Sequence, residues 1–159
     1  MYWKANLVDD DTTVRDIALS MHRIAVLGIK TEAHSSEPAY YVPQYLVDAG
    51  KEVIPVPVYF PDAQEILGQP VYRRVADIPG DIDVVNVFRR ARDIAAHVDD
   101  LLAARPDAVW FQSGIRNDEV AEQLARAGIR VVQDRCLMVE HRRARVWPSN
   151  APVRTAGIA

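Results

Sequence analysis

The stretch RIAVLG, residues 23–28, decides the fold of this chain. It is a short apolar run that ends abruptly at a glycine, as buried strands do before a tight turn. Three later runs end in the same way at proline, polar or small residues. They are 52–56 before Pro57, 83–87 before Phe88 and Arg89, and 108–111 before Gln112, Ser113 and Gly114. In open α/β sheets ligands bind outside the carboxyl ends of the strands, so these four stops predict a nucleotide-binding crevice.

Segments with helical periodicity lie between the apolar runs. Residues 12–21 predict a short leading helix capped by Asp11 or Thr12, and a later helix is expected to be capped by Asn117 and ended by Gly128. A third helix is expected to begin near Tyr41, because Pro43 fits only near a helix start. Helical spacing recurs over 94–102, and a fifth strand is expected at 129–132. Residues 59–80 show no hydrophobic periodicity, so we expect a connection there and not a crossover helix of normal length. The order predicts an α/β fold with a doubly wound, mostly parallel, five-stranded Rossmann-like sheet between two helical layers.

The chain length of 159 residues suits one domain. We expect an N-terminal extension with a short helix at 1–22, the sheet domain at 23–143 and a C-terminal tail at 144–159. The acidic opening through residue 11 is predicted to be loose, and the tail from residue 148 is predicted to be disordered.

Composition narrows the function. The formal net charge of −3 gives no overall field that would favour nucleic acid or a membrane surface. No apolar run approaches the ~20 residues that span a bilayer. With one cysteine no intrachain disulfide can form, so we expect a soluble cytoplasmic protein. One cysteine and four histidines without ligand spacing predict no metal site.

A nicotinamide dinucleotide site is an alternative with two features missing. Its usual fingerprint has three glycines after the first strand, of which only Gly28 is present. No acidic residue ends the second strand to hold the ribose. Phosphate could still bind exposed amides at Gly28, Ile29 and Lys30, helped by the helix start near Ser36. Phe88 and Arg89 could stack on a base and pair with a phosphate.

The motifs together resemble those of the small CoA-binding protein family, whose members are single Rossmann-like domains similar to the CoA-binding domain of the succinyl-CoA synthetase α subunit. The matching segments are IAVLG at 24–28, PAYYVPQYL at 38–46, ILGQPVY at 66–72, DVVNVFR at 83–89, WFQSGIRN at 110–117 and DRCLMVEH at 134–141. The chain departs from the family pattern at Ile29, Lys30 and Glu37. An acidic Glu37 would repel a phosphate unless it points away or Lys30 and His34 supply the missing charge.

The resemblance implies that coenzyme A lies across the strand ends, with its pyrophosphate at the Gly28 loop and its nucleotide near Pro57, Phe88 and Gln112. The resulting candidate cofactor-binding residues are Gly28, Ile29, Lys30, Ser35, Ser36, Pro57, Phe88, Arg89, Gln112, Ser113 and Gly114.

Three functions stay open at this point. The leading hypothesis is a noncatalytic module, with no catalytic residue, that binds CoA or acyl-CoA and acts with another protein. The second is a thiol or acyl transfer enzyme that uses Cys136 beside the CoA sulfur. The third is an NAD(P)-binding domain. A homodimer is the default expectation for a domain of this size.

Overall fold

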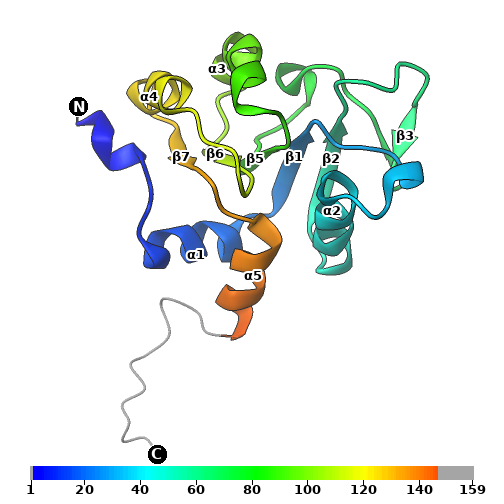
Figure 1. Ribbon diagram of the computed structural model, residues 1–159, viewed down its shortest axis with the longest axis horizontal. Coiled ribbons are helices and arrows are strands. Elements are labelled where there is room, and N and C mark those ends of the chain that lie inside the picture. Colours follow the sequence, from blue (N-terminus) through cyan, green and yellow to red (C-terminus); the bar gives the residue numbers. More distant parts are fainter. Residues whose placement is uncertain (1, 147–159) are drawn as a thin grey trace, which may run out of the picture.

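The computed structural model describes residues 2–146 and shows a central sheet with helices on both faces (Figure 1). The sheet order is β2-β1-β5-β6-β7, and every neighbouring pair is parallel. The predicted fold class is therefore confirmed, with a sheet that is wholly parallel. The predicted tail lies outside the described residues from residue 147 onward. The five strands are β1 (Arg23–Leu27), β2 (Glu52–Val56), β5 (Val84–Val87), β6 (Ala108–Phe111) and β7 (Arg130–Val132).

Alternation along each strand creates two apolar cores. In β1, Ala25 and Leu27 join one core, whereas Ile24 and Val26 join the other. The first core packs under α3 (Val98–Ala104) and α4 (Asp118–Arg126), and the second under α1 (Asp11–Ser20), α2 (Pro38–Asp48) and α5 (Leu137–Val146). A 3-10 helix, η4 (Ala91–His97), leads into α3. None of the helices within residues 2–146 is long and apolar enough to cross a membrane.

Helix α2 begins at Pro38, not near Tyr41 as predicted. Proline is favourable at the first helical position, and here Pro38 takes that position while Pro43 lies inside the helix. Pro43 has no N–H to donate to the Ala39 carbonyl one turn earlier. That carbonyl instead accepts the Lys30 amide at 3.1 Å. The bond fastens the loop after β1 to the first turn of α2.

The N-terminal segment is not loose within its described part. A 3-10 helix, η1 (Trp3–Asn6), packs on α4, and Asn6 Nδ2 donates to the Ala125 carbonyl at 2.9 Å. Leu7 forms a parallel bridge to Val131, whose carbonyl accepts the Val8 amide at 2.9 Å. The segment therefore lies along the outer edge of β7. Helix α1 then begins at Asp11 with Asp10 as its cap, one residue before the predicted positions.

The connection between β2 and β5 has no long helix, as predicted, but it contains a hairpin that the sequence reading missed. Strands β3 (Glu65–Ile66) and β4 (Gln69–Pro70) pair antiparallel. Leu67 and Gly68 between them both have positive φ, as a two-residue hairpin turn requires. The 3-10 helix η3 (Val75–Asp77) completes the connection.

Candidate functional site

The predicted stops meet at one edge of the sheet because the hydrogen-bond ladder continues one residue beyond each strand. Gly28 donates to the Val56 carbonyl at 2.9 Å, and Phe88 donates to the Leu27 carbonyl at 2.8 Å. Gln112 donates to the Val87 carbonyl at 3.2 Å. The reversal of strand order lies between β1 and β5, so the Gly28 and Phe88 turns flank the switch point.

Gly28 is required at this point by space and by backbone conformation. Its φ is +91°, and a Cβ built on it would lie 2.4 Å from the Phe88 carbonyl oxygen. The same Cβ would be 3.4 Å from Cδ of Arg89. The missing side chain therefore lets the turn after β5 and the Arg89 side chain approach the turn after β1.

Two of the three amides expected to be exposed after β1 are bonded within the protein. The Gly28 amide continues the ladder to Val56, and the Lys30 amide bonds to Ala39. The Ile29 side chain is 1% exposed and belongs to the apolar core. Among these three amides, an anion at this loop can therefore meet at most that of Ile29, and the exposed Ser35 and Ser36 lie in the turn beyond it.

The acidic Glu37 is neutralised by its neighbours. Lys30 Nζ lies 2.5 Å from Glu37 Oε1, and His34 Nδ1 lies 2.7 Å from Glu37 Oε2. The hydrogen bond from Lys30, followed by that from His34, lowers the pKa of Glu37 below its ordinary value. Lys30 thus supplies its charge to Glu37 itself and is not a free cation, and His34 Nδ1 lies within hydrogen-bond distance of the same carboxylate.

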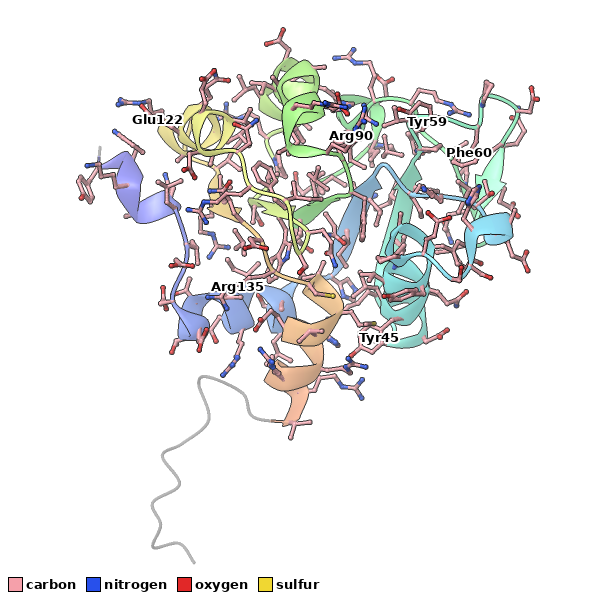
Figure 2. The ribbon with its side chains drawn as sticks, viewed as in Figure 1. Tyr45, Tyr59, Phe60, Arg90, Glu122 and Arg135 are labelled. Carbon is pink, nitrogen blue, oxygen red and sulfur yellow. The ribbon has the colours of Figure 1, made fainter. Side chains whose placement is uncertain are left out.

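Arg89 is a cation at the turn after β5, and its side chain is bonded to two other segments. Its Nε donates to His97 Nε2 at 3.2 Å, and its Nη1 donates to Tyr59 Oη at 3.4 Å. The guanidinium carbon lies 5.5 Å from the centre of the Tyr59 ring. In Figure 2, Tyr59, Phe60 and Arg90 lie along the same edge of the molecule. The sequence reading missed Tyr59 and His97, although Tyr59 follows the Pro57 stop by two residues.

The side chain of Gln112 makes hydrogen bonds within the protein. It is 4% exposed, and its Oε1 accepts from Asn86 Nδ2 at 3.2 Å and from the Leu137 amide at 3.3 Å. The side chain therefore joins β5, β6 and the start of α5, and its carbonyl oxygen is engaged within the protein. Ser113 and Gly114 are exposed at the turn, where the Gly114 amide donates to Asp134 Oδ1 at 2.6 Å.

The remaining candidates differ in exposure. Pro57 is buried at the end of β2, and Phe88 is half-buried against the core that contains α2. Cys136 is half-buried and directly precedes α5, where its carbonyl accepts the Glu140 amide at 3.0 Å. Cys136 is thus one residue from the Leu137 amide that bonds to Gln112.

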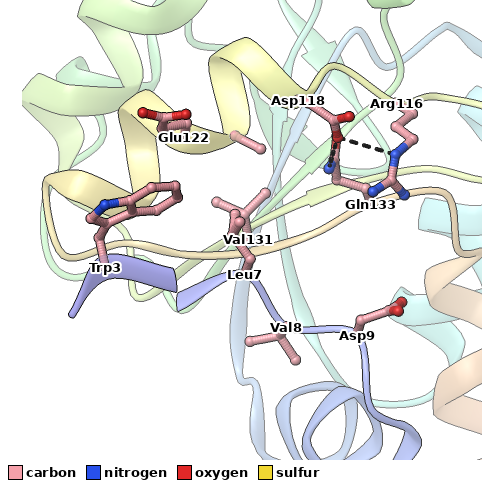
Figure 3. A pocket seen from close by; sticks show the side chains of 10 residues that line it. Trp3, Leu7, Val8, Asp9, Arg116, Asp118, Glu122, Val131 and Gln133 are labelled. Atoms are coloured by element: carbon pink, nitrogen blue, oxygen red, sulfur yellow. Dashed lines mark hydrogen bonds and ion pairs between the residues drawn. The ribbon is translucent and has the colours of Figure 1, made fainter. Parts of the chain in front are cut away.

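A hollow of about 330 Å³ lies elsewhere, along β7 and the N-terminal segment (Figure 3). Trp3, Leu7 and Val131 form part of its wall. Three of its polar side chains pair with each other: Arg116 Nε lies 3.1 Å from Asp118 Oδ1, which also accepts from Gln133 Nε2 at 3.0 Å. The hollow is separate from the Gly28 and Arg89 turns.

Known proteins resemble this chain in sequence and in fold. The chain is 32% identical over 128 residues to the uncharacterized protein YneT of Bacillus subtilis, which covers 80% of this chain and 91% of the relative. A solved protein of Thermus thermophilus is 41% identical with a TM-score of 0.76, over 85% of this chain and 98% of the other.

A larger protein contains a similar unit. An acetyl-coenzyme A synthetase of Ca. Korarchaeum cryptofilum is 27% identical with a TM-score of 0.56, over 69% of this chain and 25% of that one. Residues 22–142 match the family model described as CoA binding domain. This match spans the whole sheet and every strand-end turn described above, and the chain belongs to the CoA binding domain family.

Proposed function

We propose that residues 23–143 bind coenzyme A or an acyl-CoA at the carboxyl ends of the parallel strands, as a noncatalytic module. The observation that carries the proposal is the placement of Arg89 against Gly28 at the switch point of the sheet. An arginine whose Cδ lies beside a turn without a side chain suits a diphosphate that must approach the backbone. Membership of the CoA binding domain family supports CoA as the diphosphate compound.

Native mass spectrometry of the freshly purified protein gives the direct test. A co-purifying mass equal to CoA or an acyl-CoA supports the proposal, and a nicotinamide dinucleotide contradicts it. Thermal unfolding provides the second measurement, because a ligand at 100 times its Kd stabilises the folded state by about 2.7 kcal/mol. We expect CoA to raise the Tm and NADH to leave it unchanged.

Arg89→Ala separates the proposed site from nonspecific attraction. Arg89→Ala removes the arginine whose Cδ lies beside Gly28, whereas the control Arg92→Ala removes an exposed arginine of η4 with the same change of net charge. We expect Arg89→Ala to weaken CoA binding at least about tenfold, equivalent to 1.4 kcal/mol, and Arg92→Ala to change it by less than about twofold. Equal effects of the two variants would mean that CoA binds elsewhere.

The enzyme alternative rests on Cys136. The C136A variant is expected to keep the CoA affinity of the natural chain, because a binding module needs no nucleophile. Turnover of a CoA thioester or a CoA disulfide that disappears in C136A would replace the binding proposal with a transfer enzyme.

A further inference from the structure

Arg89 is held in place before any ligand arrives. A free arginine side chain has many rotamers, and ordering it on binding costs affinity. Here the Nε–H is directed to His97 and one Nη1 hydrogen to Tyr59, while the ring of Tyr59 lies beside the guanidinium. The planar guanidinium has five N–H donors, so three remain available.

His97 can hold Arg89 only in its neutral form. An Nε2 that accepts a hydrogen bond carries no proton, which places the proton of the neutral ring on Nδ1. Burial, followed by the charge of Arg89, lowers the pKa of His97 below its ordinary value. Asp93 of η4 and Asp100 of α3 oppose this shift. Asp93 is itself paired with Arg90 at 2.8 Å, and Asp100 accepts the Val75 and Ala76 amides.

These contacts come from three separate parts of the chain. Tyr59 follows β2, Arg89 follows β5, and His97 ends η4. Arg73 holds the backbone that carries Tyr59. Its Nη1 donates to the Tyr59 carbonyl at 3.1 Å, and its Nη2 donates to the Phe60 carbonyl at 2.8 Å. The Arg89 side chain therefore bonds to side chains from two other parts of the chain, and the backbone that carries one of them, Tyr59, is held by Arg73.

We propose that His97 and Tyr59 are positioning residues that hold the Arg89 guanidinium over the Gly28 turn, where it meets the diphosphate of CoA. This inference rests on the proposed function. It assigns no contact between His97 and the ligand: His97 acts through Arg89. Holding Arg89 in advance means that less conformational entropy is lost when a diphosphate binds.

The test is the affinity of the full chain for CoA and for dephospho-CoA by isothermal titration. His97→Leu removes the acceptor, and we expect it to weaken both ligands about tenfold at pH 7.5. His97→Gln keeps an acceptor oxygen, so it should bind within about threefold of the natural chain. Tyr59→Phe removes the second acceptor and should weaken binding by about threefold. Matched controls are His22→Leu and Tyr41→Phe, since both side chains are exposed on other parts of the molecule.

A pH series separates positioning from general damage to the fold. As the pH falls, His97 gains a proton and ceases to accept from Arg89, so affinity for dephospho-CoA should fall in the natural chain. His97→Gln has no such group and should show a flatter profile. Dephospho-CoA is the probe because it lacks the 3′-phosphate, whose own protonation falls in this range.

The outcomes distinguish the two claims. If the natural chain binds neither ligand, the proposed function fails. If it binds both, but His97→Leu and His97→Gln bind as tightly as His22→Leu with an unchanged pH profile, then His97 has no positioning role. A loss in His97→Leu that is seen with CoA and not with dephospho-CoA would place Arg89 on the 3′-phosphate and overturn the assignment to the diphosphate.

Discussion

Gly28 ties the stability of the sheet to the shape of the proposed site. Ala in its place would need a φ of +91° and would set a methyl group 2.4 Å from the Phe88 carbonyl oxygen. We expect Gly28→Ala to lower the free energy of unfolding by at least about 2 kcal/mol, measured by urea denaturation. The control is Gly50→Ala, whose φ is +87° with open space around it. It should cost only about 1 kcal/mol, and equal losses would show that the contact with Phe88 is unimportant.

His141 gives the protein a pH-dependent stability. It is 2% exposed, and its Nδ1 lies 2.9 Å from the hydroxyl of Tyr45, which is labelled in Figure 2. Burial, followed by the charges of Lys51 and Arg145, lowers the pKa of His141 to about 4. The unfolded chain, with an ordinary histidine pKa near 6.5, binds this proton first as the pH falls. Above pH 6.5 His141 is neutral in both the folded and the unfolded chain, so it does not lower the free energy of unfolding. Between pH 6.5 and 4 the unfolded chain binds the proton and the folded chain does not, so the free energy of unfolding falls.

The expected loss from this one group is about 3 kcal/mol between pH 7 and pH 4. Urea denaturation at several pH values would measure it. In His141→Gln the free energy of unfolding should lack this decrease between pH 7 and pH 4. A variant whose stability falls as steeply as that of the natural chain would assign the acid sensitivity to other groups.

At the scale of elements, a buried carboxylate links α5 to its surroundings. Glu140 is 4% exposed, and it lies 3.6 Å from Arg15 of α1, 3.6 Å from Arg135 and 3.5 Å from Arg143. Without the Glu140 charge, the partly buried guanidinium groups of Arg15 and Arg135 lose their buried partner and keep the exposed Asp9 and Asp11. We expect Glu140→Gln to destabilise the fold by about 3 kcal/mol in urea denaturation.

Glu122 provides the comparison for this prediction. It is exposed, it pairs with Arg126 four residues later on α4, and Figure 2 shows it far from Arg135. Glu122→Gln should cost less than about 0.5 kcal/mol. If both glutamates cost the same, the cluster around Glu140 contributes no more than a surface pair.

The same cluster explains why the sequence did not reveal α5. Helices α1 and α4 bury apolar side chains at helical spacing, and both were predicted within about a residue. Helix α5 buries Leu137, Glu140, His141 and Ala144, so half of its inward positions are polar. A helix is recognised in a sequence by apolar residues at helical spacing. That spacing is hidden here because two of the buried residues are polar, and their partners lie on other elements of the fold.

At the scale of the whole molecule, the parallel sheet was predictable because its strands are buried on both faces. Such strands are continuous apolar runs, and their ends mark the edge where ligands bind. The individual roles were harder to predict. Gln112 turns inward to Asn86 and Leu137, and Arg89 finds its partners Tyr59 and His97 on different segments. Only the folded chain brings these groups together.

The N-terminal segment protects one edge of this sheet. Its Leu7 bridge and Val8 amide occupy the outer side of β7 at Val131. Deleting residues 1–8 should expose that edge, and exposed strand edges promote association. We expect a lower Tm and a molar mass that rises with concentration in light scattering after size exclusion. A Trp3→Ala variant should keep the edge covered and behave as the natural chain; an unchanged deletion variant would contradict this role.

The bond between the Lys30 amide and the Ala39 carbonyl has a consequence for variation in loop length. It divides the connection between β1 and α2 into a short part, fixed to both the sheet and the helix, and the part from residue 31 to 37, which spans between two anchored points. Extra residues in the second part would lengthen a loop that is already closed, at an entropic cost that grows only slowly with length. Extra residues between Gly28 and Lys30 would instead move the amide away from its acceptor. Relatives of this chain should therefore differ in length after residue 30 and keep the spacing before it.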